Sequence, residues 1–277
     1  MKVVTEPSVY VLGRQQLVSL ELDAFLADHG VSWESDSEIA AEVVTETAGR
    51  VCYMSFAKPR PGGNSAYLQH IKEVGHGSVL EHAVWSFLIT GVSRSLTHEF
   101  VRHRAGFAYS QLSQRYVDES VAECVLPPDL YDEYQAVREF HDGCIANEWT
   151  DEAEAGRVWF DAVESAHAAY GKLVEYLSKK AERRGLEKTE ARKYARQAAR
   201  SVLPNATETK ITVTANARAL RHFLEQRGSK FAEPEIRVLA NQMLNHLKIE
   251  SANLFGDYTQ TPLPDGTHEI TTPYRKV

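Results

Sequence analysis

The chain has 277 residues, of which 43% are hydrophobic and 25% charged, as is usual for a folded globular protein. Its formal net charge of -7 argues against general nucleic-acid binding, which requires a basic surface. No run of about 18 apolar residues suggests a membrane span, and the first residues lack the basic and apolar segments of a secretory signal.

The three cysteines, Cys52, Cys124 and Cys144, are far apart, and no CxxC motif is present. An odd number of isolated cysteines argues against a disulfide framework and against a structural zinc site. The spacing of His76, Glu81 and His82 matches no trusted metal motif. We therefore expect a cytoplasmic protein without a bound metal.

The first third of the chain predicts one strand, two helices and a second strand. Residues 1–12 have the pattern of a short strand, and helical patterns follow at 36–50 and 64–75. Asn64 is the expected N-cap of the second helix. Residues 82–91 are almost continuously apolar, with β-branched and aromatic members, which indicates a buried strand.

The middle of the chain is predominantly helical. Ser93 is expected to open a helix over 93–103, and the small and polar residues at 105–116 predict a loop. From 133 to about 200 the pattern is again helical, with a break near Gly185.

The last part of the chain predicts a strand and two helices. Residues 207–214 alternate polar and apolar side chains, which indicates a half-exposed strand. Asn216 is the expected N-cap of a helix that ends near residue 227, and 232–250 forms another. The residues from about 255 to 277 contain three prolines and are predicted to form an extended arm or a partly disordered tail. The prediction is one α+β domain over 1–277, with helices outnumbering strands.

The densest group of reactive side chains lies in the segment SRSLTHEFVRHRAGFAYSQLSQRY, residues 93–116. On a helix, Arg94, His98 and Arg102 share one face. Cations favour a helix C-terminus, which explains one or two of these basic residues. It does not explain the hydroxyl-rich and amide-rich loop that follows, ending with Arg115, and from the spacing alone a site for phosphate or carboxylate is as well supported as the macrodipole explanation.

This segment resembles the signature of the flavin-dependent thymidylate synthases, RHR followed by a serine and then by RY. Four further blocks occur in the order of that family: GHGSVLEH (75–82), RSVLP (200–204), TANARALRHFLEQR (214–227) and AEPEIR (232–237). A weaker match, VCYMSFAKP (51–59), precedes them. Five clear blocks in order are unlike a chance match. The resemblance implies the fold of that family, with a mixed sheet, long flanking helices and a homotetrameric assembly.

The resemblance also implies the site residues. FAD would be held by Ser78, Glu81, Arg102, His103, Arg104, Asn216, Arg218 and His222. The nucleotide would be held by Glu99, Arg102, Gln111, Leu112, Ser113, Gln114, Arg115, Arg200 and Arg227. Those expected to take part in catalysis are Arg227, Arg200, Ser113 and His76.

The implied reaction is reductive methylation of C5 of dUMP, with methylenetetrahydrofolate as carbon donor and NADPH as reductant. Uracil C5 becomes nucleophilic when negative charge develops at O4 and N3, and Arg227 with Arg200 would stabilise that charge. Ser113 has no neighbouring base in the sequence, so it is expected to bind substrate rather than to attack it. Each site would combine residues from three subunits.

The spacing departs from the family signature in one place. Eight residues, AGFAYSQL, separate RHR from Ser113, where seven are usual, and the added residue lies near Ala105 and Gly106. A longer loop near the ribose could admit a 2′-hydroxyl. A UMP/dUMP C5-methylase of a nucleoside antibiotic pathway is therefore the alternative to a dUMP enzyme.

Two further alternatives come from other classes of protein. A helical nucleic-acid-binding module would use the basic helix ends, and an RNA uracil methylase would require a wide basic surface. Arg192, Arg196 and Arg200 are spaced at i, i+4 and i+8 and would form a basic stripe on a helix, but only Arg200 is expected to bind a ligand, and a solvated face is the usual role of such a stripe.

Overall fold

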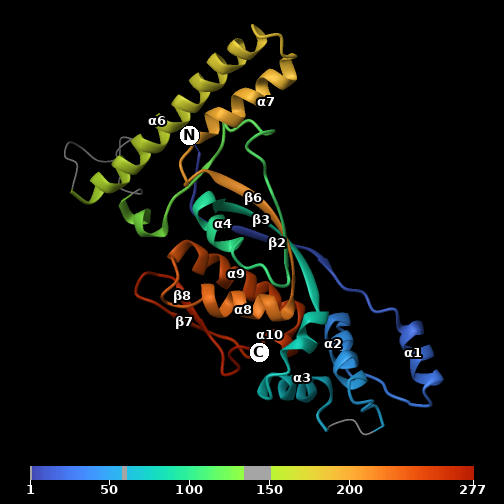
Figure 1. The fold of residues 1–277 in the computed structure, drawn as a ribbon. Helices are drawn as coiled ribbons and strands as arrows, with labels where there is room; N and C mark the ends of the chain where they lie inside the picture. Colours follow the sequence, from blue (N-terminus) through green and yellow to red (C-terminus); the bar gives the residue numbers. More distant parts are fainter. Residues whose placement is uncertain (1, 58–60, 134–150) are drawn as a thin grey trace. The chain divides into compact units, whose positions relative to one another are not determined.

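The computed structural model describes residues 2–57, 61–133 and 151–277, with the backbone alone for 151–153 (Figure 1). The chain forms two compact units. Unit 1 contains Met1–Pro7, Thr90–Glu99 and Gln111–Ile211, and unit 2 contains Ser8–Ile89, Phe100–Ser110 and Thr212–Val277. Helices and strands are mixed, as predicted. In the described part of the chain, no helix has both the length and the apolar character needed to cross a membrane.

A four-stranded sheet has the order β2-β3-β6-β4. Its strands are β2 (Ser8–Arg14), β3 (Val84–Ser93), β6 (Glu208–Asn216) and β4 (Phe107–Gln111). The strands predicted at 82–91 and 207–214 are confirmed as β3 and β6. The prediction of a loop over 105–116 is wrong for the residues of β4. There the aromatic residues Phe107 and Tyr109 alternate with the small residues Ala108 and Ser110, which made the alternation of a strand difficult to recognise.

The N-terminal part of unit 2 differs from the prediction in two places. Helix α1 (Ser19–Asp28) was not expected, because Leu26 is its only buried side chain and its apolar periodicity is weak. Helices α2 (Ala40–Val51) and α3 (Gly63–Glu73) confirm the two predicted helices. Asn64 is not the N-cap of α3, which is Gly62. Asn64 is instead buried inside the helix, where its amide donates to Glu46 Oε2 at 2.7 Å.

Two helices form the centre of unit 2. Helix α8 (Ala217–Arg227) packs on α9 (Pro234–Glu250), confirming both predictions. The predicted cap of α8 is also confirmed, since Asn216 Oδ1 accepts a hydrogen bond from Ala219 N at 2.9 Å. Fully buried apolar side chains join these helices to the strands; they are Trp85, Phe87, Ile89, Val213, Leu220, Phe223, Leu224, Met243, Leu244 and Leu247.

The residues after α9 are ordered, so the prediction of an extended or disordered arm is wrong. Helix α10 (Ala252–Phe255) is followed by β7 (Thr259–Pro262) and β8 (His268–Thr271), which pair in an antiparallel hairpin. Ile270 and Val277 are buried, which explains why this segment is fixed to the rest of the unit.

Unit 1 contains the longest helix of the described part of the chain. Helix α6 (Asp151–Glu182) packs along α7 (Lys188–Ala199), as Figure 1 shows, and the predicted break between them is confirmed at Gly185, whose φ is +88°. The predicted residues 134–150 lie outside the described part. Helix α4 (Arg94–Phe100) opens as predicted, with Leu96 N donating to Ser93 Oγ at 3.0 Å. It ends at Phe100, so Arg102 is not on the helix with Arg94 and His98.

Short elements complete the units. Strand β1 (Val3–Val4) pairs in parallel with β5 (Cys124–Val125). Short 3-10 helices are η1 (Gly77–His82), η2 (Pro128–Leu130) and η3 (Arg200–Val202). The predicted strand over 1–12 is thus two strands, β1 and β2, separated at Pro7, which cannot donate a backbone hydrogen bond.

Candidate functional site

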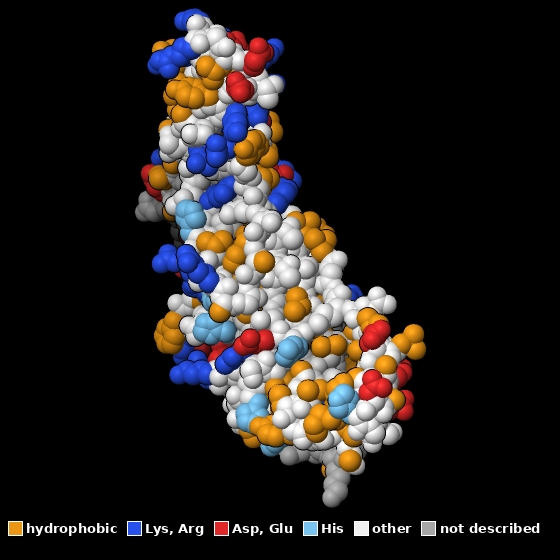
Figure 2. All heavy atoms as spheres, turned by 45° about the vertical axis from the view of Figure 1, so that its right-hand side comes forward, with side chains coloured by type: hydrophobic (Ala, Val, Ile, Leu, Met, Phe, Trp, Pro, Cys, Tyr) orange, Lys and Arg blue, Asp and Glu red, His pale blue; other side chains and the backbone are white. Residues whose placement is uncertain are grey.

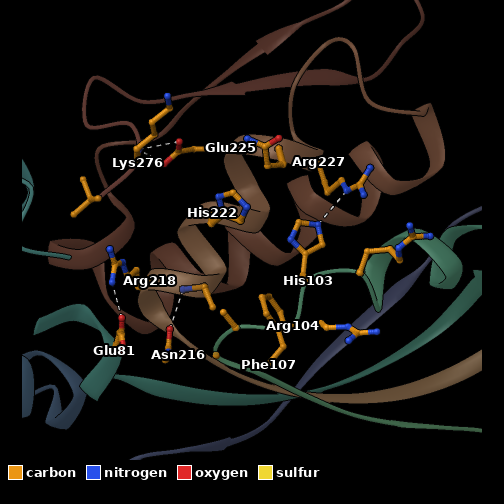
Figure 3. A pocket seen from close by; sticks show the side chains of 16 residues that line it. Glu81, His103, Arg104, Phe107, Asn216, Arg218, His222, Glu225, Arg227 and Lys276 are labelled. Atoms are coloured by element: carbon orange, nitrogen blue, oxygen red, sulfur yellow. Dashed lines mark hydrogen bonds and ion pairs between the residues drawn. The ribbon is translucent and has the colours of Figure 1, made fainter. Parts of the chain in front are cut away.

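A cavity of about 800 Å3 lies in unit 2 and is open to solvent (Figure 3). Its wall is formed by α8, by the loop between α4 and β4, by Glu81 of η1 and by the end of the chain. The residues that line it are Glu81, Arg102, His103, Arg104, Ala105, Gly106, Phe107, Asn216, Arg218, Ala219, His222, Glu225, Gln226, Arg227, Lys276 and Val277. We call this cavity the α8 pocket.

Helix α8 presents one face to the α8 pocket. Arg218, His222 and Glu225 are spaced at i, i+4 and i+7, which places them on the same side of the helix. Arg218 Nη1 donates to Glu81 Oε1 at 2.6 Å. Both of these side chains are about half exposed, so the ion pair is accessible to solvent and to a ligand.

His103 is held as a neutral acceptor inside the α8 pocket. Arg227 Nε donates to His103 Nε2 at 3.1 Å, and the two side chains face each other in Figure 3. Burial, with help from Arg227 and His222, lowers the pKa of His103 from 6.5 to about 4. At neutral pH the imidazole is uncharged, and acceptance at Nε2 places its proton on Nδ1.

An aromatic pair fixes the loop that carries His103. Phe107 and Tyr109 are stacked, with ring centroids 5.6 Å apart and an interplanar angle of 2°. The Tyr109 hydroxyl donates to the carbonyl oxygens of Phe100 at 2.9 Å and His103 at 2.7 Å. Tyr109 therefore packs and positions the loop, while Phe107 also lines the α8 pocket.

Gly106 forms a tight turn in the loop that precedes β4. Its φ is +74°, and a Cβ at this position would lie 2.6 Å from Asn216 Nδ2. Phe107 N donates to Arg104 O at 3.2 Å, which closes a tight turn. A larger residue at 106 would collide with Asn216 and strain the backbone, so the turn requires glycine.

The α8 pocket is suited to an anionic, partly aromatic ligand. It contains five cationic side chains, Arg102, Arg104, Arg218, Arg227 and Lys276, and two carboxylates, Glu81 and Glu225. Arginine forks bind phosphate groups, and the Phe107, His103 and His222 rings offer surfaces for an aromatic ring. A flavin dinucleotide combines these two features. In the described part of the chain, no group of three or more His, Cys, Asp or Glu side chains could hold a metal ion.

The predicted nucleotide loop, residues Gln111–Arg115, lies in unit 1 and is held by its own neighbours. Arg94 Nη2 donates to Leu112 O at 2.7 Å, and Leu112 N donates to Lys210 O at 2.9 Å. The Gln111 amide donates to Thr97 Oγ1 at 2.9 Å. Burial lowers the pKa of Arg94, which stays charged because the pKa of an arginine is far above neutral.

The structure divides the predicted residues between the two units. Eight of them line the α8 pocket: Glu81, Arg102, His103, Arg104, Asn216, Arg218, His222 and Arg227. His76 and Ser78 are exposed in unit 2 but do not line that pocket. Glu99, Arg200 and the loop Gln111–Arg115 belong to unit 1. Arg200 is exposed at the start of η3.

Four lining or positioning residues were missed at the sequence level. Glu225 could have been found from its spacing after Arg218 and His222 on one helix. Arg94 was noticed only as part of a helix face and not as a support for Leu112. Lys276 and Val277 carry no local signal, because only the folded tail brings them to the pocket.

The basic residues of unit 1 do not form one surface on the face shown in Figure 2. There, Lys and Arg side chains are interspersed with hydrophobic ones along α6 and α7. Arg192 is exposed as expected, but Arg196 is mostly buried, with 16% of its side chain exposed. Its Nη1 donates to Tyr116 O and its Nη2 to Asp118 Oδ2, both at 2.8 Å. Arg196 thus supports the backbone after the nucleotide loop.

Comparisons with known proteins agree on one family. The model of the Thy1 family, described as thymidylate synthase complementing protein, matches residues 36–250. The flavin-dependent thymidylate synthase of Mycobacterium sp. (strain JLS) is 47% identical over 254 residues, which cover 90% of this chain and 92% of the relative. That of Mycobacterium tuberculosis (strain ATCC 25177 / H37Ra) is 44% identical with the same coverage.

The fold is similar to that of solved structures. The UMP/dUMP methylase PolB from Streptomyces cacaoi, bound with 5-Br dUMP, superposes with a TM-score of 0.62 over 92% of this chain and 96% of that protein. Its complex with 5-Br UMP gives a TM-score of 0.61. Both are 19% identical to this chain, so they establish similarity of fold alone.

Proposed function

The chain belongs to the flavin-dependent thymidylate synthases, and from this premise we propose that it converts dUMP to dTMP with FAD, methylenetetrahydrofolate and NADPH. The chain is an enzyme, a methyltransferase that acts on C5 of a uridine monophosphate. The identity of the two co-substrates and the assignment of residues to them are our proposal. The observation that carries it is the cationic and aromatic α8 pocket, where eight predicted residues converge.

FAD fits the donor set of the α8 pocket. Arg102, Arg104 and Arg218 would bind its phosphate groups, and the rings of His103 and Phe107 would lie against its aromatic part. When bound, the flavin supplies the transfer of reducing equivalents from NADPH to the carbon unit. The side chains around it bind, orient and exclude water.

Arg227 is proposed to stabilise negative charge on the uracil ring. A guanidinium near N3 and O4 favours the charge distribution that makes C5 nucleophilic. The neutral His103 supports this role, because its Nε2 accepts from Arg227 Nε and fixes one edge of the guanidinium. Arg227 itself lines the α8 pocket.

A cysteine nucleophile is not part of the proposal. Burial raises the pKa of the Cys124 thiol to about 12, which leaves almost no thiolate at neutral pH. Cys52 is exposed and does not line the α8 pocket. Cys144 lies outside the described residues.

We propose, from the family resemblance, that the nucleotide is bound by Glu99, Arg102, Gln111–Arg115, Arg200 and Arg227. His76 is proposed to act on the flavin and folate side. We further propose a homotetramer, in which subunits share each site. Light scattering would then give about four times the chain mass of 31.1 kDa. A monomer with full activity would contradict this assembly.

A UMP-accepting enzyme is the second candidate. Two observations favour it: the added residue before Ser113, and the similarity of fold to PolB, a UMP/dUMP methylase. We propose that the tight turn at Gly106 accommodates the extra residue, so that it lies beside the α8 pocket rather than within Gln111–Arg115. With the extra residue there, the loop Gln111–Arg115 would keep its usual length, and dUMP therefore stays the first candidate.

The proposed function is tested by product analysis. Purified protein with FAD and NADPH receives methylenetetrahydrofolate labelled in its one-carbon unit, with dUMP in one reaction and UMP in another. We expect label in dTMP and bound flavin in the absorption spectrum of the protein. A colourless protein that transfers no label to either nucleotide would contradict the proposal.

A further inference from the structure

The segment Thr272–Val277, which we call the strap, is fastened by a buried cluster of charges. The Asp257 carboxylate accepts from Arg221 at 2.8 and 2.9 Å, from Lys72 Nζ at 2.8 Å and from Thr272 Oγ1 at 2.5 Å. Arg221 also donates to Tyr274 O at 3.2 Å. These charges lower the pKa of Asp257 to about 2 against the opposing effect of burial, so it stays ionised.

The far end of the strap reaches the α8 pocket. Lys276 N donates to the two oxygens of Glu225 at 3.1 and 3.3 Å. The φ of Lys276 is +61°, an uncommon conformation for a residue with a side chain. A backbone in this region persists where its surroundings hold it, and such residues gather at functional sites.

Val277, the last residue of the strap, is tightly packed. Its exposed fraction is 7%, and it lies against Gly77. A Cβ on Gly77 would be 2.9 Å from Arg218 Nε and closer still to the carbonyl carbon of Val277. The strap, Gly77 and Arg218 therefore fit together without room for a further methyl group.

Burying several charges costs desolvation free energy, which is offset here by the hydrogen bonds and ion pairs between them. The strap follows residues 36–250, the part that matches the family model, so its contribution is not implied by that match. The carboxylates of the α8 pocket are engaged: Glu81 with Arg218, and Glu225 with the Lys276 backbone. In the described part of the chain, no carboxylate pairs with the Lys276 ammonium group, which remains available for an anion.

We propose that Lys276 is a binding residue for a phosphate group of FAD, and that Asp257 is the positioning residue that holds the strap for it. Lysine is suited to this role as a mobile point charge at a phosphate. Arg218, on the same pocket wall, supplies the planar fork. The inference rests on the proposed function, because it takes FAD as the ligand of the α8 pocket.

The first test compares Lys276→Ala with Arg275→Ala. Arg275 is an exposed neighbour in the strap that does not line the α8 pocket, so the two variants lose the same charge one residue apart. Flavin fluorescence gives the dissociation constants of FAD and of riboflavin, which has no phosphate. Lys276→Ala should weaken FAD binding about five- to tenfold and leave riboflavin unchanged, and Lys276→Arg should retain most of the affinity.

Three results would overturn the inference. They are equal effects of Lys276→Ala and Arg275→Ala on FAD, an equal loss for riboflavin, and a loss of NADPH affinity with FAD affinity intact. Wild-type protein that binds no flavin would contradict the proposed function as well. Flavin binding by the wild type with unaltered binding by Lys276→Ala would contradict the inference alone.

The second test concerns Asp257. Asp257→Asn should weaken FAD binding by a similar factor, and combining it with Lys276→Ala should add less than the product of the two effects, because both act through one contact. If Asp257→Asn does not fold, Thr272→Val serves as the test. It removes a single hydroxyl from the cluster and should weaken FAD binding about twofold. Two results would exclude the positioning role. One is full additivity of the effects of Asp257→Asn and Lys276→Ala on FAD binding, and the other is unchanged FAD affinity in both single variants, Thr272→Val and Asp257→Asn.

Discussion

The α8 pocket and the loop Gln111–Arg115 are both rich in arginine and amide groups, but they use these groups differently. In the α8 pocket, arginines of unit 2 line an open cavity. At the loop, Arg94 and Arg196 of unit 1 donate to backbone carbonyl groups at Leu112 and Tyr116. The first region offers its cations to a ligand, and the second uses them to hold the backbone in shape.

This difference separates binding from positioning. An arginine whose hydrogen bonds go to carbonyl groups of its own chain fixes the conformation of a loop. An arginine that lines an open cavity beside a neutral histidine can place its charge near a bound ligand. Variants in the two regions should therefore change different measured quantities.

The largest effect is expected for Arg227→Ala. Removal of the guanidinium should lower kcat for methyl transfer about 100- to 1000-fold, because it withdraws charge stabilisation from the uracil ring. FAD should remain bound. The measurement is product formation under saturating substrate, with Arg192→Ala on the exposed face of α7 as the control. A loss smaller than about threefold would remove Arg227 from the mechanism.

Arg94→Met tests the other region. Without the hydrogen bond to Leu112 O, the nucleotide loop should shift, and KM for dUMP should rise about 30-fold while the FAD dissociation constant is unchanged. Steady-state kinetics and flavin titration of the same preparation provide the two values. Equal losses of FAD and nucleotide affinity would abolish the distinction between the regions.

His103 predicts a dependence of stability on pH. Its pKa is near 4 in the folded protein and 6.5 in the unfolded chain, so the unfolded state takes up a proton first as the pH falls. The free energy of unfolding should decrease by about 1–2 kcal/mol between pH 6.5 and pH 4, after allowance for partial exposure, and this contribution is fully present above pH 6.5. Denaturant titrations over this pH range should show the decrease in the free energy of unfolding for the wild type and not for His103→Gln. Parallel curves would contradict the neutral histidine.

The smallest effect concerns the N-cap of α8. Asn216→Ala removes the acceptor for Ala219 N and should lower the free energy of unfolding by about 1 kcal/mol. Asn216→Asp keeps an acceptor and should retain most of the stability. Thermal unfolding of both variants checks the cap. If Asn216 only bound a ligand, the two variants would have equal stability.

Sequence patterns predicted the elements whose signals are local. The apolar run of β3, the alternation of β6 and the cap at Asn216 each depend on neighbours within a few residues. Helix α1 was missed because it buries only Leu26, and β4 because small residues conceal its alternation. Asn64 was misassigned because its buried partner Glu46 is 18 residues away.

The site was predictable to a similar degree. Recognition of the family motifs identified eight residues of the α8 pocket, although spacing alone favoured only an anion site near Arg102. The strap could not be predicted, because its place depends on Asp257 meeting Arg221 and Lys72 in three dimensions. Buried ion pairs between distant segments leave no periodic signal in a sequence.

The central claim is that the protein methylates C5 of a uridine monophosphate, and tritium release from C5-labelled dUMP tests it most directly. Each reaction contains FAD, NADPH and methylenetetrahydrofolate, and C5-labelled UMP is measured in parallel. We predict release from dUMP that depends on all three additions and is much slower from UMP. Comparable release from UMP would make the protein a UMP/dUMP methylase, and release from neither nucleotide would contradict the account.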